Sequence, residues 1–381
     1  MSMKILHVIV SLNVGGAELM LQRLIEHQSV ATNCEHEVVS LTKLGKVGNI
    51  LIQRNFKVYA LHMNGLLDFP QALLNLRRLI KRGKPDIVQT WMYHADLMGG
   101  IAAQWAGVRQ IVWGVRTTNV AEGGSRPTAM VRRLCAWLSF RVPHTIVCAA
   151  EASRKAHVAL GYDASRMRVV PNGFDLEKLR ATVEQRNTLR LQCSMELGAI
   201  VIGYLGRFHP VKDQQNFVRA AGILSNRNRN ARFLMVGTNL DASNLLLAEW
   251  IRATGHADRF LLLGERADVA ACLSAMDVFC LSSRTEGFPN VVAEAMAMGL
   301  PCVVTDVGDA AMLVADTGVV VPKEDSPALA AGLERVLAMA PDVRHELGQR
   351  AKERVASEFS ISRACERFDS IYQQALLQGN S

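Results

Sequence analysis

Short runs of Val, Ile and Leu alternate along the first half of the chain with longer segments whose apolar residues recur at helical spacing. Residues 17–28 and 69–81 are two such helix-length segments. The apolar runs predict buried strands at residues 4–11, 36–42, 57–63, 86–92, 110–116 and 144–150. Because parallel strands need a crossover between them and are covered on both faces, this alternation predicts a parallel sheet with helices on both sides.

The rhythm breaks at Pro171-Asn172-Gly173 and resumes after the polar segment 175–196. Further strands are predicted at residues 200–206, 232–237, 260–264, 278–282, 301–306 and 318–322, and residues 326–377 have an almost wholly helical pattern. The 381 residues, 49% of them hydrophobic, exceed what one core usually supports. We therefore predict an α/β fold with two Rossmann-like, doubly wound domains, residues 1–175 and residues 197–359.

The eight cysteines form no Cys-x-x-Cys pair, and several lie in apolar runs. This pattern predicts reduced thiols in a cytoplasmic protein and disfavours disulfides or a zinc site. Residues 1–11 continue as a strand into a glycine-containing turn, unlike a secretory signal, and no apolar run is long enough to cross a bilayer. We expect a cytoplasmic protein that is soluble or peripheral on the inner face of the cell membrane.

Basic residues are concentrated in the first half of the chain. Residues 1–180 contain 23 Lys or Arg against 12 Asp or Glu, whereas the remainder contains 20 against 23. A positive surface attracts nucleic acid, anionic lipid or phosphorylated substrates without distinguishing among them. Since no aromatic-basic nucleic-acid motif occurs, we expect no nucleic-acid partner.

The most informative motif runs from Glu286-Gly-Phe-Pro to Glu294 and Gly299-Leu-Pro. Pro289 suits a helix start and Gly299 a helix end, which places Glu286 in a loop after a strand and Glu294 in the early turns of the next helix. Open α/β sheets bind ligands at this edge, where two carboxylates can accept hydroxyl hydrogens from a sugar ring and a ribose. A solvated residue beside a helix dipole is the alternative for Glu286, but it does not explain Glu294 inside an apolar stripe.

A second motif, Gly206-Arg207-Phe-His-Pro-Val-Lys212, follows the first strand of the second half. Arg207 offers a planar fork and Lys212 a point charge, which together could neutralise a diphosphate leaving group. A surface turn is the alternative, and the position at a strand end favours ligand binding. With two such cations and no Asp-x-Asp motif, we expect no cofactor and no metal requirement.

A third motif, Gly15-Gly16, forms a tight turn between the first strand and the first helix. Glycines there let backbone N–H groups and the helix N-terminus approach a phosphate or a sugar. The turn is not Gly-x-Gly-x-x-Gly, and no acidic residue ends the second strand, which disfavours a nicotinamide dehydrogenase.

Together these three motifs resemble the family 4 retaining glycosyltransferases of the GT-B fold, and so do the Pro171-Asn172-Gly173 junction and the segment 263–268. The resemblance covers nearly the whole chain, and the Glu-x7-Glu element is its most specific part. It implies two domains facing across a cleft that binds a sugar nucleotide. It also implies that the final segment, residues 360–381, returns to the first domain, where Phe368, Ile371 and Tyr372 would pack.

The resemblance also implies roles for single residues. Arg207 and Lys212 would bind the donor phosphates, and Glu294 the ribose hydroxyls. Glu286 would contact the transferred sugar. The remaining candidates for donor binding are Gly15, Gly16, Gly264, Arg266, Asp268, Phe288 and Asn290, of which Gly264 to Asp268 would border the base.

One position departs from the family pattern. Many relatives carry a His after the fifth strand, where this chain has Arg116. Arginine cannot act as a base at neutral pH, although it could steady a phosphate or an acidic sugar. His94, after the fourth strand, is the nearest histidine candidate, and a cap or surface role is its alternative. The candidate catalytic residues are therefore Glu286, Arg207, Lys212, Arg116 and His94.

The acceptor side is suggested by residues 127–141, which combine bulky apolar residues with cations at helical spacing. A second basic cluster comprises Arg77, Arg78, Lys81, Arg82 and Lys84. Such helices can lie reversibly on an anionic membrane, and a core helix with solvated cations is the alternative for each alone. Together they favour a glycan or lipid-linked acceptor in the synthesis of cell-surface polysaccharide or lipopolysaccharide.

The sequence thus predicts a retaining glycosyltransferase that uses a UDP- or GDP-linked sugar. A GT-B epimerase or phosphorylase, or a non-catalytic protein that binds sugar nucleotides, remains an alternative. Donor hydrolysis without an acceptor would separate the enzymes from the binding protein.

Overall fold

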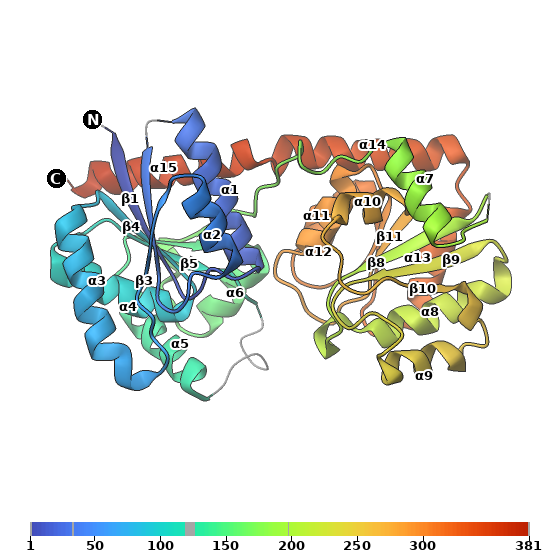
Figure 1. Ribbon diagram of the computed structural model, residues 1–381, viewed down its shortest axis with the longest axis horizontal. Helices are drawn as coiled ribbons and strands as arrows, with labels where there is room; N and C mark the ends of the chain where they lie inside the picture. Colours follow the sequence, from blue (N-terminus) through green and yellow to red (C-terminus); the bar gives the residue numbers. More distant parts are fainter. Residues whose placement is uncertain (1, 33, 119–125, 197, 380–381) are drawn as a thin grey trace. The chain divides into compact units, whose positions relative to one another are not determined.

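The computed structural model describes residues 2–32, 34–118, 126–196 and 198–379. The chain divides into two compact units. Unit 1 comprises Met1–Gly173 and Ile361–Ser381, and unit 2 comprises Phe174–Ser360 (Figure 1). Each unit is built around its own parallel sheet, which confirms the predicted α/β class.

The sheet of unit 1 has seven strands in the order β3-β2-β1-β4-β5-β6-β7. Their bounds are β1 Met3–Ile9, β2 Cys34–Ser40, β3 Lys57–Ala60, β4 Ile87–Trp91, β5 Ile111–Val115, β6 Thr145–Cys148 and β7 Met167–Val169. The chain begins at the interior strand β1, runs outward through β2 and β3, and then runs outward in the other direction from β4 to β7. The strands β1 and β4 therefore flank the switch point where such sheets bind ligands. The sequence analysis missed β7, a three-residue edge strand too short to give a periodic signal.

Helices cover both faces of this sheet. They are α1 Gly16–Ala31, α2 Gly45–Gln53, α3 Phe69–Gly83, α4 Tyr93–Ala106, α5 Arg126–Leu138, α6 Glu151–Ala159 and α15 Ile361–Gly379, with short 3-10 turns η1 Leu66–Asp68 and η2 Ala164–Arg166. Alternate residues of β1 point to opposite faces. Ile5 and Ile9 join a core with α1, α2 and α15, whereas Leu6 and Val8 join a core with α3, α4 and α5.

The last helix, α15, packs on unit 1 beside α1 (Figure 1). Phe368 and Tyr372 are fully buried, and the Phe368 ring lies 6.2 Å from that of Trp91. Gln28 Nε2 donates to Asp369 Oδ1 at 2.6 Å. The two ends of the described chain therefore share one core.

Unit 2 contains a six-stranded parallel sheet in the order β10-β9-β8-β11-β12-β13. The strands are β8 Ile200–Leu205, β9 Ala231–Val236, β10 Phe260–Leu262, β11 Val278–Leu281, β12 Cys302–Thr305 and β13 Gly318–Val321. The helices are α7 Val183–Gln192, α8 Gln214–Arg227, α9 Leu245–Ala253, α10 Val269–Ser274, α11 Asn290–Ala297, α12 Ala310–Val314, α13 Ser326–Leu337 and α14 Pro341–Glu358, with 3-10 turns η3 Pro210–Lys212, η4 Ala257–Arg259 and η5 Ala315–Thr317. All six strands predicted for the second half are present.

The polar segment left between the predicted domains belongs to unit 2. Its helix α7 is joined to the sheet by Arg186 and Arg190, whose guanidinium groups contact the Asp277 carboxylate at 2.6 and 2.7 Å. Two arginines on one carboxylate give a hydrophilic helix a fixed place on the domain.

All eight cysteines are free thiols, as predicted. Burial raises the pKa of all eight, for example to about 12 for Cys148. No helix in the described ranges is both long and apolar enough to cross a membrane.

Candidate functional site

Three loops of unit 2 follow neighbouring strands at the carboxyl edge of its sheet. They follow β8, β11 and β12, which are adjacent in the strand order. The β8 loop contains Arg207 and Lys212, and the β11 loop contains Glu286. Because the strands are parallel, the fold brings these separate motifs to one edge.

Lys212 and Glu286 form the centre of this edge. Lys212 Nζ lies 2.6 Å from Glu286 Oε1, and Ser283 Oγ donates to the same oxygen at 2.6 Å. The Lys212 side chain is 22% exposed and that of Glu286 10% exposed. The sequence analysis named both charged residues but missed their pairing and missed Ser283, because a lone serine in a loop gives no signal.

Further contacts tie the β8 and β11 loops together. Ser282 Oγ donates to the carbonyl oxygens of Lys212 and Asp213 at 3.1 and 3.0 Å. Arg284 Nε lies 2.9 Å from Asp213 Oδ2, and its backbone N–H donates to the Val211 carbonyl. These contacts hold the two loops together.

The β12 loop supports Glu286 from the other side. Gly308 has a φ of +55°, and a Cβ built there would lie 2.3 Å from the Glu286 carbonyl oxygen. Asp309 N donates to the Gly287 carbonyl at 2.9 Å. Any side chain at Gly308 would therefore displace the backbone of Glu286.

Glu294 lies half-buried in the second turn of α11, whose first residue is Asn290. Pro289 is the N-cap of this helix, one position earlier than the sequence analysis placed it, and Gly299 follows its end with a φ of +76°. The Phe288 ring is buried, 6.2 Å from Phe174 and 5.5 Å from Phe359. Phe288 can thus offer a ligand only its backbone.

Arg207 is exposed at the start of the β8 loop. Within the described ranges its guanidinium makes no hydrogen bond or ion pair, while its carbonyl accepts from Gln214 Nε2 at 2.8 Å. Gly264 has a φ of +64° just after β10, and its N–H donates to the Leu240 carbonyl. Arg207 and Gly264 are thus placed at the same edge of the sheet.

Arg266 and Asp268 form a bidentate ion pair, with Nε–Oδ1 and Nη2–Oδ2 distances of 2.8 and 2.5 Å. The hydrogen bonds from Arg266 lower the pKa of Asp268. The sequence analysis placed both residues beside the base, and in the structure each already has the other as partner.

The remaining candidates lie in unit 1. Gly15 is the N-cap of α1, and Gly16 is the first residue of that helix. A third glycine, Gly45, shapes the same turn: its φ is +62°, and a Cβ there would lie 2.5 Å from the Leu12 carbonyl oxygen. The sequence analysis missed Gly45, which is distant from the turn in sequence.

Arg116 directly follows β5, and its side chain packs against aromatic rings of unit 1. Its guanidinium lies 4.7 Å from the centre of the Trp91 ring and 5.8 Å from that of Phe368, and Nη1 donates to Asn172 Oδ1 at 2.5 Å. Burial lowers the pKa of Arg116 to about 10, so it stays charged at neutral pH. Its contacts connect the sheet to α15.

His94 is the second residue of α4 and is half-buried. Burial lowers its pKa, so the imidazole is neutral at pH 7. Nearby in the sequence, Asp96 is fully buried, accepting from Thr90 Oγ1 at 2.5 Å and from Gly114 N at 3.2 Å. Burial raises the pKa of Asp96 to about 7, a perturbation that the sequence analysis missed.

Comparison with known proteins identifies the family. One family model, described as Glycosyltransferase Family 4, matches residues 14–178, and another, described as Glycosyl transferases group 1, matches residues 199–339. The chain belongs to the group 1 glycosyltransferases. A glycosyltransferase is therefore the interpretation that stands, ahead of an epimerase, a phosphorylase or a non-catalytic binding protein.

The named relatives include enzymes of polysaccharide and lipid-linked sugar synthesis. An Escherichia coli UDP-Gal:alpha-D-GlcNAc-diphosphoundecaprenol alpha-1,3-galactosyltransferase is 26% identical over 81% of this chain and 80% of its own. The capsular polysaccharide biosynthesis glycosyltransferase CapM of Staphylococcus aureus is 26% identical over 80% of this chain and 81% of its own. The crystal structure of Anabaena HepE with UDP and glucose has a TM-score of 0.84 at 22% identity, covering 98% of this chain and 100% of its own, which shows the GT-B fold.

Proposed function

We propose that this glycosyltransferase moves a sugar, with retention of its anomeric configuration, from a nucleotide diphosphate sugar to a glycan or lipid-linked acceptor in cell-surface polysaccharide synthesis. The observation that carries the proposal is the Lys212–Glu286–Ser283 cluster at the carboxyl edge of the unit 2 sheet. The donor is UDP-linked rather than GDP-linked, since the Escherichia coli relative is named for UDP-Gal and the HepE structures hold UDP or UDP-glucose.

On this proposal the cations bind the donor phosphates. Lys212 turns from Glu286 to the diphosphate, and the exposed Arg207 adds a second positive charge. Negative charge grows on the diphosphate as the glycosidic bond breaks, so fixed cations stabilise the transition state more than the ground state. This role needs no metal.

The carboxylates orient the rest of the donor. Glu286 accepts hydrogen bonds from hydroxyls of the transferred sugar, and Glu294 accepts from the ribose. The segment 264–268 borders the base, and the backbone N–H of Phe288 or Asn290 contacts phosphate or sugar. Gly15 and Gly16 approach the donor through the start of α1, and Arg116 and His94 are the polar groups of unit 1 assigned to the reacting sugar.

A nucleotide panel tests the donor assignment. Thermal unfolding is measured with UDP, GDP and their common hexose and N-acetylhexosamine derivatives, because a ligand that binds only the folded state raises the unfolding temperature. We expect stabilisation by UDP and by one or a few UDP-sugars, with and without chelator. Stabilisation by the GDP series alone would overturn the UDP assignment, and stabilisation by none would overturn the proposed donor class. NMR of the isolated product then gives the anomeric configuration, and inversion would refute retention.

The acceptor assignment relies on the exposed face of α5 and on Phe140 and Arg141, which follow this helix. Met130, Trp137 and Phe140 are 68%, 60% and 54% exposed, and Arg141 lies 5.1 Å from the centre of the Trp137 ring. Bulky apolar side chains beside cations suit an anionic membrane surface, where a lipid-linked acceptor would be presented.

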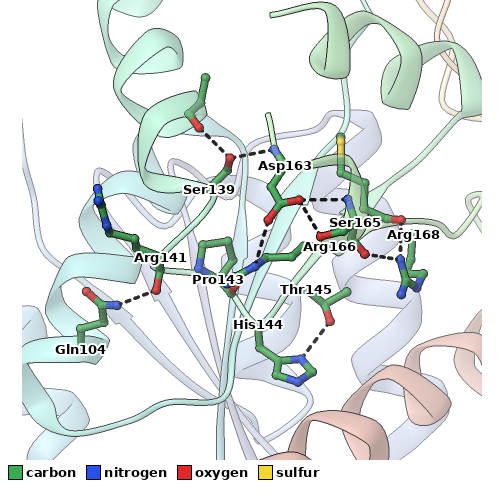
Figure 2. A network of polar contacts seen from close by, with 12 residues as sticks. Gln104, Ser139, Arg141, Pro143, His144, Thr145, Asp163, Ser165, Arg166 and Arg168 are labelled. Atoms are coloured by element: carbon green, nitrogen blue, oxygen red, sulfur yellow. Dashed lines mark hydrogen bonds and ion pairs between the residues drawn. The ribbon is translucent and has the colours of Figure 1, made fainter. Parts of the chain in front are cut away.

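The end of α5 is fixed by a polar network (Figure 2). Gln104 Nε2 donates to the Arg141 carbonyl, Asp163 N to Ser139 Oγ, and Arg166 to the Pro143 carbonyl. The backbone around Trp137, Phe140 and Arg141 is therefore held in place by the rest of unit 1.

Vesicle sedimentation tests this surface. We expect binding to vesicles containing phosphatidylglycerol that weakens with salt and falls several-fold in the double variant Trp137→Ala, Phe140→Ala. Leu245→Ala, a similarly exposed apolar residue in unit 2, is the matched control and should bind as the wild type does. Equal binding of all three proteins, or binding independent of anionic lipid, would remove α5 from the acceptor side.

A further inference from the structure

Unit 2 contains a wide groove whose lining shares no residue with the Lys212–Glu286 cluster. Its volume is about 910 Å³, and its walls are α8, α9 and the segment 322–327 between β13 and α13. The groove includes none of the residues assigned to the donor. Its volume is within the usual range for small-molecule sites.

Close packing of α8 and α9 shapes the groove. A Cβ built at Gly222 on α8 would lie 3.0 Å from Thr254 Cβ, just beyond α9, so the glycine lets the two helices approach. Trp250 of α9 and Asn226 of α8 both line the resulting surface. A flat aromatic side chain and an amide thus lie along one concave wall.

Several polar side chains of this wall have hydrogen-bonding groups that a ligand could use. Trp250 is half-buried, with its ring 5.6 Å from that of Phe208, and its indole N–H has no partner among the residues the structure describes. Asn226 Oδ1 accepts from His256 Nε2 at 2.9 Å, which leaves the amide N–H groups to donate outward. Gln215, also on α8, makes no side-chain hydrogen bond within the described ranges.

The charges of the groove are balanced. Arg219 and Lys323 are opposed by Glu324 and Asp325, all four lining the same space. Asp325 Oδ1 accepts from Ala328 N at 2.8 Å as the N-cap of α13, and Glu324 Oε1 lies 3.3 Å from Arg284 Nε. A nucleotide or an anionic headgroup would meet these carboxylates, whereas a neutral ligand rich in hydroxyls could use both donors and acceptors.

We infer that this groove binds a neutral oligosaccharide, with one sugar ring against Trp250 and neighbouring hydroxyls on Asn226 and Gln215. The sugar face is apolar and its rim is polar, which matches an aromatic wall surrounded by amides and ions. The groove is open rather than enclosed, as a site for an internal stretch of a longer glycan must be. This site goes beyond the proposed transfer reaction and does not depend on it.

The test uses the full-length protein and a panel of neutral hexasaccharides of glucose, galactose, mannose and N-acetylglucosamine. Binding is measured by saturation-transfer NMR and by tryptophan fluorescence. We expect at least one member to bind with a dissociation constant of roughly 1 mM or tighter. Trp250→Ala should raise this dissociation constant by about tenfold or more, and Asn226→Ala should raise it by several-fold. Lys323→Ala should change it by less than about twofold, because the ligand is uncharged.

Controls separate a lost site from lost folding. Leu246→Ala changes an exposed residue of α9 outside the groove and should bind as the wild type does. Far-UV circular dichroism and the unfolding temperature confirm that each variant is folded, and the exposed Asn226 gives a variant that keeps the test valid if Trp250→Ala unfolds. No binding by any panel member, or binding unaffected by Asn226→Ala and by a folded Trp250 variant, would overturn the inference. Binding that is weakened about tenfold or more by Lys323→Ala would also overturn it, because it would show that the groove recognises charge.

Discussion

Glu286→Gln tests the central ion pair most directly. Lys212 Nζ lies 2.6 Å from Glu286 Oε1, so on the proposed mechanism a diphosphate must compete with that carboxylate for the lysine. Glutamine keeps the shape of the side chain and can still accept a hydrogen bond, but it lacks the charge. Free UDP, which lacks the transferred sugar, should therefore bind the variant as well as or better than it binds the wild type.

The expected magnitude follows from the geometry of the pair. A hydrogen bond between two charged groups contributes roughly 1.5–3 kcal/mol and one to a neutral acceptor roughly 0.5–1.5 kcal/mol. Both side chains are mostly shielded from water, so about 1 kcal/mol of competition is removed, equivalent to up to about fivefold tighter UDP binding. Turnover should fall by about 10²-fold, because the contact to the sugar strengthens as the bond breaks.

Isothermal titration with UDP and UDP-sugar, together with steady-state kinetics, measures these effects. Lys212→Met is the opposite perturbation and should weaken UDP by at least about tenfold. Ser283→Ala removes the other hydrogen bond to the same Glu286 oxygen, and should leave UDP affinity unchanged while lowering turnover only slightly. If Glu286→Gln lowered the affinity for UDP as much as Lys212→Met does, the competition between carboxylate and diphosphate would be refuted.

Three further predictions concern other positions. Glu294→Gln should weaken UDP and UDP-sugar alike, by roughly 1–3 kcal/mol, with the main kinetic effect on KM; an unchanged KM would contradict the ribose assignment. Chelator should leave activity intact, and activity restored only by added magnesium or manganese would contradict metal independence. The pKa of Asp96 rises on folding from 3.8 to about 7, so the folded state holds an extra proton between these values and loses stability as pH rises through that window. Urea unfolding measures this effect. Between pH 5 and pH 8 the free energy of unfolding of the wild type should fall by roughly 3 kcal/mol more than that of Asp96→Asn, and equal decreases would show that Asp96 does not titrate in this range.

The sheets could be predicted because each central strand is buried on both faces and appears as an unbroken apolar run. The strand β7 was missed because three edge residues, one of them the exposed Arg168, carry no such run. Helix α7 was left outside both domains because its attachment depends on Asp277, which lies far away in the sequence. Local pattern gives the elements, whereas the contacts that assign a polar helix to a domain are non-local.

The site shows the same division. Glu286, Lys212 and Arg207 could be named because each charged residue follows a predicted strand, and parallel strands end at one edge. Their geometry could not be predicted, since the Lys212–Glu286 pair joins residues separated by 74 positions. Arg116 was read as a group facing substrate, and the structure adds contacts with Trp91 and Phe368 that no local pattern carries.

The position of α15 has a consequence for how this chain folds during synthesis. Domains of most multidomain proteins complete in order from the N-terminus as they leave the ribosome. Here the core around Trp91 lacks Phe368 and Tyr372 until the last 19-residue helix has been made, so unit 2 can finish folding first. Until then the apolar surface that α15 covers is exposed on the nascent chain, where chaperones can bind it. A C-terminal truncation should therefore damage the half of the protein that is synthesised first.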